Sequence, residues 1–350
     1  MKIILAPMEG LTDVHMRHIL TQMAGQTGFD WCVTEFIRIT QQLLLPKAFY
    51  YYCPELLTGG KTASGTPVHV QLLGSDPQLL AENAQRVVEL GAPAIDLNFG
   101  CPAKSVNQHR GGAVLLEEPE LVHQIVSAVR KAVPKTIPVS AKMRLGVNDR
   151  SKMVDNALAI ESAGASWLTV HARTKADAYR PPAHWHELAT IRQHVKLTII
   201  ANGDIDSVAN AQLCQQQSQC TDLMIGRAAV IQPYLIRALR GESHQLTWSE
   251  LVAWQVQFLQ HMQHAVANPL LADSQQKWTE VGAIGRYKQW LGMLLQAWPE
   301  AHTLFQQIKK ERSYHQIYQY VQQCFVCHLE DTLWNHLLAV CLWDQFYVLF

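Results

Sequence analysis

Short apolar runs rich in β-branched residues alternate with longer helical patterns over the first part of the chain, to about residue 240. This alternation is typical of βα units built around a parallel sheet. The apolar runs predict eight strands, at residues 3–6, 31–36, 68–72, 94–97, 139–143, 167–171, 197–201 and 223–225. Eight strands in this length favour a (β/α)8 TIM barrel over a doubly wound sheet, whose Gly-x-Gly-x-x-Gly turn is absent from the sequence.

Beyond about residue 243 the pattern becomes helical, with Leu251, Phe258 and Met262 falling on one helix face. We therefore expect an α/β barrel followed by a smaller all-helical domain. The predicted domains are a catalytic barrel over residues 1–242, a helical domain over residues 243–323, and an apolar C-terminal tail of unassigned role over residues 324–350. The longest uncharged run of the tail is too short to cross a bilayer, so we expect no membrane association.

Composition adds modest constraints. The 29 basic residues balance the 29 acidic ones, so the net charge neither requires nor excludes a nucleic-acid partner. The N-terminus has only a short apolar run before Pro7, too short for a secretion signal. The eight cysteines are widely dispersed, which does not suit a disulfide framework. We expect a cytoplasmic protein with free thiols.

Candidate chemistry is concentrated in the segment from Asp96 to Pro102, which places Cys101 in a glycine-containing turn directly after an apolar strand. Loops at the carboxyl ends of barrel strands build the active sites of this fold. Cys101 is therefore a candidate acid or nucleophile. The alternative is that Cys101 only fills core space, as many free cysteines do.

Polar residues also follow the other predicted strands, and in a barrel they would converge on one mouth. Glycines and an arginine in the segments Asn202–Asp204 and Gly226–Arg227 are suited to binding a phosphate after strands seven and eight. Lys142 would place a cation in a largely apolar mouth, which favours a ligand with anionic or carbonyl character. No cluster has metal-ligand spacing, so we expect no metal.

Within the helical domain, the segment Gly285–Trp290 brings cations and aromatic residues together. Such a segment can bind phosphates and stack bases, although a solvated amphipathic helix has the same pattern.

Taken together, six motifs resemble those of the tRNA-dihydrouridine synthases over residues 1 to about 310. They are Ala6-Pro7-Met8-Glu9-Gly10, Asp96-Leu97-Asn98-Phe99-Gly100-Cys101-Pro102, Lys142-Met143-Arg144-Leu145-Gly146, His171-Ala172-Arg173-Thr174, Ala201-Asn202-Gly203-Asp204 and Ile225-Gly226-Arg227. Glu9-Gly10 and Arg286-x-Lys288-Gln289-Trp290 are most similar to the bacterial C class, which acts on uridine 16. The chain departs from that class by extending past residue 320 to Phe350.

The resemblance implies an enzyme that reduces the C5–C6 double bond of uracil in tRNA, with bound FMN and with NADPH as reductant. It implies Cys101 as the proton donor. The residues implied to hold FMN are Pro7, Met8, Gln71, Lys142, His171, Asn202, Gly203, Asp204, Gly226 and Arg227. The residues implied to contact tRNA are Arg38, Asn98, Arg144, Arg286, Lys288 and Lys309. We expect no obligate protein partner and a monomer.

Three alternatives remain open. The enzyme could belong to another class of the same family, acting on uridine 17 or 20. It could be an FMN barrel that reduces small molecules, such as a dihydroorotate dehydrogenase or an ene-reductase. It could also be a non-catalytic tRNA-binding or chaperone protein with a remnant barrel.

Overall fold

The computed structural model describes residues 1–267 and 279–330, with side chains as far as Cys324. The chain divides into two compact units, of which the first runs from Met1 to His244 and the second begins at Gln245. The last helix, α14 (Tyr314–Glu330), continues through residue 324, where the predicted tail begins. Residues 331–350 of that tail lie outside the described residues.

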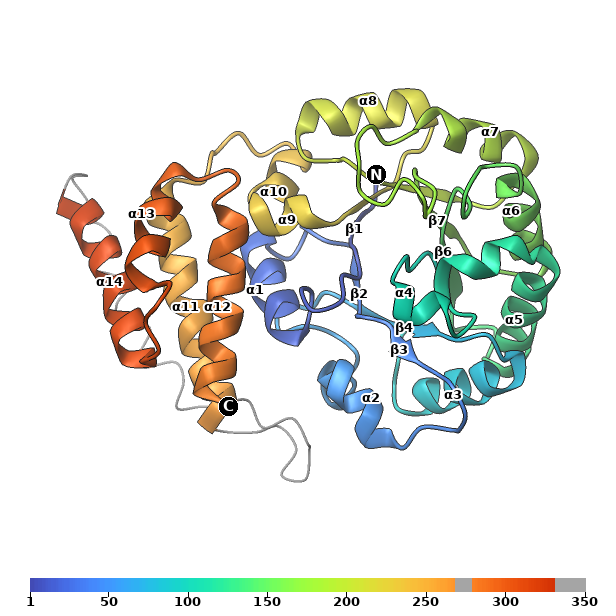
Figure 1. Ribbon diagram of the computed structural model, residues 1–350, viewed down its shortest axis with the longest axis horizontal. Coiled ribbons are helices and arrows are strands. Elements are labelled where there is room, and N and C mark those ends of the chain that lie inside the picture. Colours follow the sequence, from blue (N-terminus) through green and yellow to red (C-terminus); the bar gives the residue numbers. More distant parts are fainter. Residues whose placement is uncertain (268–278, 331–350) are drawn as a thin grey trace. The chain divides into compact units, whose positions relative to one another are not determined.

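In the part of the chain that the structure describes, the first unit contains a nine-stranded parallel sheet that closes on itself (Figure 1). Its strands are β1 (Ile3–Leu5), β2 (Trp31–Val33), β3 (Ile37–Arg38), β4 (Val68–Leu73), β5 (Ile95–Phe99), β6 (Val139–Arg144), β7 (Leu168–His171), β8 (Ile199–Asn202) and β9 (Leu223–Ile225). Strand β1 pairs with both β2 and β9, and β2 pairs with β4, which closes the barrel. The predicted TIM barrel is confirmed.

One predicted strand differs in detail. Residues 31–36 were expected to form a single strand, but β2 and β3 are separate and both pair with β4. From Cys32 to Ile37 the chain advances five residues, while the paired residues on β4, Val68 and Leu72, are four apart. The extra residue is accommodated between β2 and β3, as in a β-bulge. Together, β2 and β3 therefore occupy one of the eight strand positions around the barrel.

Helices surround this sheet (Figure 1). They are α1 (Val14–Ala24), α2 (Pro46–Tyr52), α3 (Pro77–Glu89), α4 (Lys104–Asn107), α5 (Pro119–Ala132), α6 (Met153–Ser162), α7 (His186–His194), α8 (Val208–Ser218), α9 (Arg227–Ile231) and α10 (Leu235–Leu239), with 3-10 turns η1 (Pro54–Thr58) and η2 (Gly112–Glu117). Their starts follow sequence signals. Asp13, Asp76 and Ser207 cap α1, α3 and α8 by accepting a backbone N–H of the first turn.

Aromatic rings pack near the amino ends of the strands. Trp31 stacks on His69 with ring centroids 5.1 Å apart, and Trp167 lies 5.2 Å from Trp31 and 5.7 Å from His69. Apolar side chains including Ile4 and Met224 complete this cluster. Burial lowers the pKa of His69 to about 3, so its ring is neutral. The barrel is thus packed at this end, and the polar strand ends lie at the other.

The second unit is helical where it is described, with α11 (Trp248–Ala267), α12 (Glu280–Leu294), α13 (Pro299–Ile308) and α14. Its core joins α11 to α12 through Phe258 and Trp290, whose rings meet edge to face at 5.1 Å. The Tyr287 hydroxyl donates to Gln255 Oε1 at 2.8 Å in the same core. Among the described residues, no helix is long and apolar enough to cross a membrane.

Candidate active site at the mouth of the barrel

The carboxyl ends of the strands bring the predicted polar residues together. Strand register places Asn98 on β5 beside Lys142 on β6, and His171 on β7 beside Asn202 on β8. Parallel strands end at the same side of a barrel, so these side chains share one mouth. Sequence reasoning from the strand ends therefore located this group of residues correctly.

The turn that carries Cys101 is held by hydrogen bonds from both sides. Asn98 Oδ1 accepts the backbone N–H groups of Gly100 and Cys101, each at 2.9 Å. The Cys101 carbonyl accepts from Ala113 N at 3.0 Å and from Asn107 Nδ2 at 2.9 Å. The Cys101 side chain packs with Leu73 and Val106, and the residue is 9% exposed. Burial raises the pKa of the Cys101 thiol, so the thiol is protonated at neutral pH.

Lys142 is a cation at this mouth without a direct partner. Among the described residues, no hydrogen-bond or ion-pair partner of its Nζ is found. Burial, together with the neighbouring Arg144 charge, lowers the pKa of Lys142 to about 8. A half-buried ammonium with no direct ion pair to the described residues favours a ligand that brings anionic or carbonyl oxygen to it, although the Asp96 carboxylate acts on it from further away.

Backbone N–H groups gather after β8 and β9. Within residues 1–267 and 279–330, no protein acceptor is found for the N–H groups of Gly203, Gly226 and Arg227. Gly203 has a φ of +117°, and a Cβ there would lie 2.9 Å from His171 Cδ2, so only glycine suits this position. Unpaired N–H groups beside an arginine form a suitable cradle for a phosphate.

Two of the predicted cofactor residues have partners within the protein. Asp204 forms an ion pair with Arg173 and accepts Ala183 N at 3.0 Å, so its carboxylate orders the loop after β7. Asn202 Nδ2 donates to the Met224 carbonyl at 2.8 Å, which links β8 to β9. Burial and four nearby cations hold the pKa of His171 well below its usual value, so the ring is neutral.

Arg144, expected to contact tRNA, is 2% exposed and donates to three backbone carbonyls. Its Nε reaches Gly100 O at 2.9 Å, and its Nη1 reaches Thr174 O and Ala178 O, each at 2.9 Å. It therefore ties the Cys101 turn to the loop after β7. This contact depends on a loop remote in sequence, which residue patterns could not reveal.

Tyr179 was missed by sequence reasoning. Its ring, in a residue that is 53% exposed, lies between two guanidinium groups, with Arg144 at 5.3 Å and Arg227 at 4.9 Å from its centroid. An open pocket of about 590 Å³ begins beside it and includes Asp204 in its lining. An aromatic residue in an irregular loop carries no periodic signal, so only the fold brings it to the mouth.

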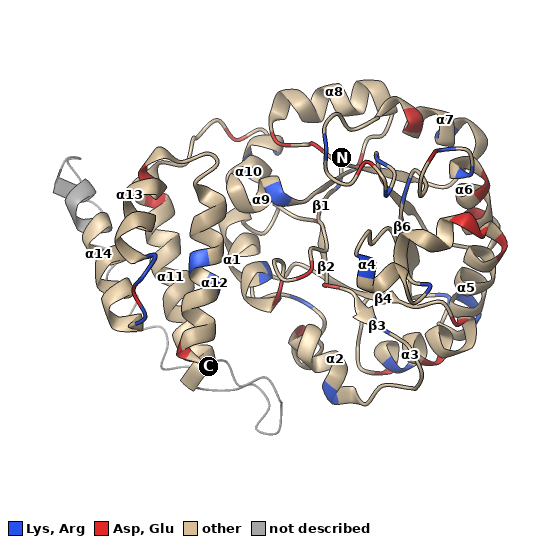
Figure 2. Ribbon diagram, in the orientation of Figure 1, with Lys and Arg blue, Asp and Glu red and all other residues tan. Residues whose placement is uncertain are grey.

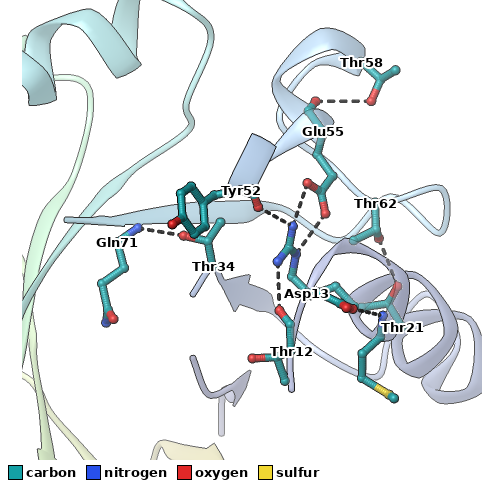
Figure 3. A network of polar contacts seen from close by, with 11 residues as sticks. Thr12, Asp13, Thr21, Thr34, Tyr52, Glu55, Thr58, Thr62 and Gln71 are labelled. Carbon is teal, nitrogen blue, oxygen red and sulfur yellow. Dashed lines mark hydrogen bonds and ion pairs between the residues drawn. The ribbon is translucent and has the colours of Figure 1, made fainter. Parts of the chain in front are cut away.

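The loop after β1, which carries Pro7 and Met8, is held in place by a buried ion pair. Arg17 on α1 binds both oxygens of Glu55 at 2.9 Å and donates to Thr12 O at 2.8 Å. The Thr12 hydroxyl in turn accepts Met8 N at 2.7 Å. Figure 3 shows the Glu55 carboxylate and the Thr12 carbonyl of this network and, beside it, the Thr34 hydroxyl accepting the backbone N–H of Gln71.

The other residues expected to contact tRNA lie in both units. Arg38 ends β3 in the first unit, and its guanidinium reaches Ser105 O at 3.5 Å. Lys288 Nζ in the second unit donates to the carbonyls of Lys309, at 3.1 Å, and Glu311, at 2.5 Å, so it caps the end of α13. This contact brings Lys288 and Lys309 together. Figure 2 shows the basic segment on α12 and the basic and acidic residues that follow α13.

Arg286 differs from these lysines in being buried. It is 6% exposed, and its Nη1 donates to Gln289 Oε1 at 2.6 Å. The neighbouring Tyr287 and Trp290 are fully buried. These two aromatic residues therefore pack the helical core and are not available to stack bases, which corrects that interpretation of the Gly285–Trp290 segment.

Comparison with known proteins agrees with this geometry. The model of the dihydrouridine synthase (Dus) family matches residues 4–323. The chain belongs to the dihydrouridine synthase family. It is 49% identical over 316 residues to a tRNA-dihydrouridine(16) synthase of Pseudomonas syringae pv. tomato, covering 89% of this chain and 95% of the relative. It is 42% identical to the protein of that name from Shewanella oneidensis, covering 92% and 98% of the two chains. The chain is thus an oxidoreductase of this family.

Solved structures share the barrel at low sequence identity. A 2-naphthoyl-CoA reductase aligns with a TM-score of 0.53 and 12% identity, over 69% of this chain and 50% of that one. Histamine dehydrogenase from Rhizobium sp. 4-9 aligns with a TM-score of 0.51 and 12% identity, over 69% and 45% of the chains. At this level of identity the likeness concerns the fold alone.

Proposed function

We propose that this protein reduces uridine 16 of tRNA to dihydrouridine, with FMN as the bound cofactor and NADPH as the electron source. The observation that carries the proposal is a protonated, buried thiol at Cys101 and a nearby Lys142, for which the described residues offer no direct partner, at the mouth of a dihydrouridine synthase barrel. The preference for uridine 16 rests on the relatives that carry this position in their names.

The residues at the mouth suit FMN. The unpaired N–H groups of Gly203, Gly226 and Arg227 would bind its phosphate. Lys142 would meet the electron-rich flavin ring, which supplies a counter-charge for the lysine. The remainder of the cofactor site would be lined, as the family resemblance implies, by Pro7, Met8, Gln71, His171 and Asn202. The Asp204 carboxylate, paired with Arg173, would act by ordering the loop after β7.

Cys101 would supply a proton to C5 of uracil. FMN, once reduced by NADPH, would supply a hydride to C6 of uracil, and the negative charge left on the ring would be neutralised by a proton at C5. A thiol whose pKa is raised by burial keeps its proton at neutral pH until that charge develops. The hydrogen bonds that hold the Cys101 turn would keep the thiol in one place, which favours a single direction of transfer.

Substrate binding would involve both units. Asn98 would bind the uracil edge, and Arg144 would act mainly by holding the Cys101 turn and the Tyr179 loop. Uracil has to leave its stack to reach a buried thiol, so contacts to the rest of the tRNA are needed. Candidates for those contacts are Arg38, Lys288 and Lys309, and Arg286 would support its helix from within. We propose a monomer that acts in the cytoplasm.

The direct test is to incubate the flavin-loaded protein with NADPH and unmodified tRNA and to map dihydrouridine by position. We expect dihydrouridine at position 16 with the wild type and a rate lower by about a hundredfold or more with Cys101→Ala. Cys220→Ala is the matched control, because Cys220 is also buried but hydrogen-bonds to Ser218 O at the end of α8.

The product pattern separates the alternatives. Dihydrouridine at position 17 or 20 would support the enzyme and contradict the uridine 16 assignment. Oxidation of the reduced flavin by small enones, with no product in tRNA, would favour a small-molecule reductase. Tight tRNA binding without turnover would favour a non-catalytic tRNA-binding protein, and unchanged turnover in Cys101→Ala would remove the proton-donor role.

A further inference from the structure

A chain of side-chain hydrogen bonds crosses the barrel interior from β6 to the Cys101 turn. Ser140 Oγ donates to Asp96 Oδ1 at 2.6 Å, and Gln71 Nε2 donates to Asp96 Oδ2 at 2.6 Å. Asn98 Nδ2 then donates to Gln71 Oε1 at 2.7 Å. Strand register makes these contacts possible, because Asp96 pairs with Gln71 on one side and with Ser140 on the other. The four residues whose side chains form this series of hydrogen bonds are all buried.

The direction of this chain follows from the chemistry of its ends. An ionised carboxylate only accepts hydrogen bonds, so Asp96 requires Gln71 to turn its Nε2 toward it. Gln71 Oε1 is then left to accept from Asn98 Nδ2. At the far end, the Gly100 and Cys101 N–H groups can only donate, and they bind Asn98 Oδ1 at 2.9 Å each. Both side-chain amides are therefore held in one of their two orientations.

This orientation decides what the two amides can offer a ligand. Each NH2 group has two hydrogens, and each uses one of them inside the chain. For the second hydrogen of Gln71 Nε2 and of Asn98 Nδ2, no acceptor is found in the described part of the protein. Both amides thus retain an unused donor, which suits the carbonyl oxygens of a pyrimidine ring. An amide turned by 180° would instead present its own carbonyl oxygen, which would repel the carbonyl oxygens of the ring.

A buried carboxylate is costly in this position, which argues that it does more than fill space. Burial raises the pKa of Asp96, since the charged form loses hydration. A neutral amide of the same size would avoid that cost and could still bind Gln71. Unlike the carboxylate, however, an amide could present either its oxygen or its nitrogen to Gln71, so the orientation of both amides would be set from the Gly100 and Cys101 end alone.

We propose that Asp96 is a positioning residue whose carboxylate, together with the Gly100 and Cys101 N–H groups at the other end, fixes the orientation of the Gln71 and Asn98 amides and so supports the turn that carries Cys101. The effect on uracil reduction rests on the proposed function. The effect on Gln71 concerns the flavin side of the same site and can be measured without tRNA.

The test is a cycle of three variants, Asp96→Asn, Gln71→Glu and the double variant, made in the flavin-loaded protein. In the double variant, the amide introduced at position 96 can donate to the carboxylate introduced at position 71, whose other oxygen can accept from Asn98 Nδ2. The donor between positions 96 and 71, which Gln71→Glu alone removes, is then restored although the charge has moved to the neighbouring strand. Asp222→Asn is the matched control, because the Asp222 carboxylate binds Lys2 N at 2.7 Å, away from the mouth.

The readout is the rate at which unmodified tRNA reoxidises the reduced flavin in a single turnover. We expect Asp96→Asn and Gln71→Glu each to slow this rate about ten- to hundredfold, and the double variant to regain about tenfold or more over Gln71→Glu. The rate of Asp222→Asn should stay close to that of the wild type. A purely structural role would lower the thermal midpoint of the variants without this recovery in the pair.

Several outcomes would overturn the proposal. A wild-type rate in Asp96→Asn would do so, as would a double variant no faster than Gln71→Glu. If Asp96→Asn fails to fold, the comparison of Gln71→Glu with the double variant still decides, and a double variant that also fails to fold counts against the proposal. If the wild-type protein binds FMN but makes no dihydrouridine, the proposed function fails. The positioning role of Asp96 is then tested by the affinity for FMN, which should fall in Asp96→Asn and stay unchanged in Asp222→Asn.

Discussion

Burial sets the protonation of two key side chains at the mouth in opposite ways. It raises the pKa of the Cys101 thiol and keeps it protonated, whereas it lowers the pKa of Lys142 to about 8 and makes its charge easier to lose. A protonated thiol is needed for proton donation, and a charged lysine is needed to meet an electron-rich ring. The same buried surroundings thus keep the proton on Cys101 and destabilise the charged form of Lys142. A bound ligand with anionic or carbonyl oxygen would stabilise that charged form.

We expect Lys142→Met to stabilise the flavin-free protein while it weakens flavin binding and turnover. The folded pKa of about 8 lies below the ordinary value of 10.5, so burying the charged form destabilises the fold. Allowing for partial exposure, the gain at pH 7 should be about 1–2 kcal/mol in the free energy of unfolding. Urea unfolding of the wild type and the variant measures it.

The pH dependence provides the check on this cause. The destabilisation caused by the buried Lys142 charge is fully present below about pH 8, the pKa of Lys142 in the folded protein. It disappears between about pH 8 and 10.5, where the folded wild type loses this proton and the unfolded chain still keeps it. The stability difference between variant and wild type should therefore shrink as the pH rises through this range. A difference that stays constant with pH would mean that packing, and not charge, explains it.

At this scale the sequence predicts which residues reach the mouth but not how each is used. Cys101, Lys142 and Asn98 lie at or just after the ends of their strands, and strand order alone brings them together. Arg144 also ends a strand, but its partners are the Gly100 carbonyl, 44 residues earlier, and two carbonyls in a loop 30 and 34 residues later. No local pattern encodes such a long-range contact, so its structural use became visible only in the fold.

Among the elements, α1 has the clearest link to the site. Its Arg17 is fully buried against Glu55 of η1, and the same guanidinium holds the Thr12 carbonyl at the start of the helix. Thr12 then holds the backbone of Met8. The ion pair thus transmits the position of a surrounding helix to the loop proposed to contact flavin.

We expect Arg17→Ala to destabilise the protein by about 3–5 kcal/mol, because it leaves Glu55 charged and buried without a partner. FMN should also bind more weakly, since the loop after β1 loses its anchor. Equilibrium unfolding and titration of the stripped protein with FMN measure the two effects.

The double variant Arg17→Met/Glu55→Leu is the control for the charge. Replacing both charges by apolar groups of similar size should recover most of the lost stability. FMN binding should recover less, because the donor to Thr12 is still missing. Full recovery of FMN affinity in the double variant would contradict a role of this anchor in the site.

Helices and strands were largely predictable from the sequence where the spacing of apolar residues was regular. The apolar face of α11 and the strand runs of the barrel carried strong signals, and Phe258 and Met262 are buried as that face requires. The division of one predicted strand into β2 and β3 was not predictable, because a bulge depends on the register with β4. Tyr287 and Trp290 were ambiguous for another reason, since buried and exposed aromatic residues look alike in a short segment.

For the whole molecule, the balance of charge means that tRNA affinity has to come from local groups of cations. Lys309 and Lys310 are exposed at the end of α13, next to Lys288. Reversing these two charges, with Lys309→Glu/Lys310→Glu, should weaken tRNA binding about tenfold or more and lower the magnitude of the salt slope by about 1–2. Reduction of the flavin by NADPH should be unchanged.

Lys131→Glu/Lys135→Glu is the matched control in the barrel unit, where both lysines are exposed at the end of α5 and just after it. An equal loss of tRNA affinity in the control would mean that only net charge matters. Affinity should be measured at several salt concentrations, because a single value does not separate a lost phosphate contact from a change in fold.

The pairing of β1 with β9 has a consequence for how the protein is made. Ile3 on β1 pairs with Leu223 on β9, so the first strand to leave the ribosome has to wait for the last strand of the barrel. At ordinary rates of synthesis this delay is roughly 10–40 s, during which one edge of β1 has no partner. The barrel therefore closes late, through contacts of high sequence separation, which makes folding slow. During that interval the nascent chain presents an apolar strand edge that chaperones can protect.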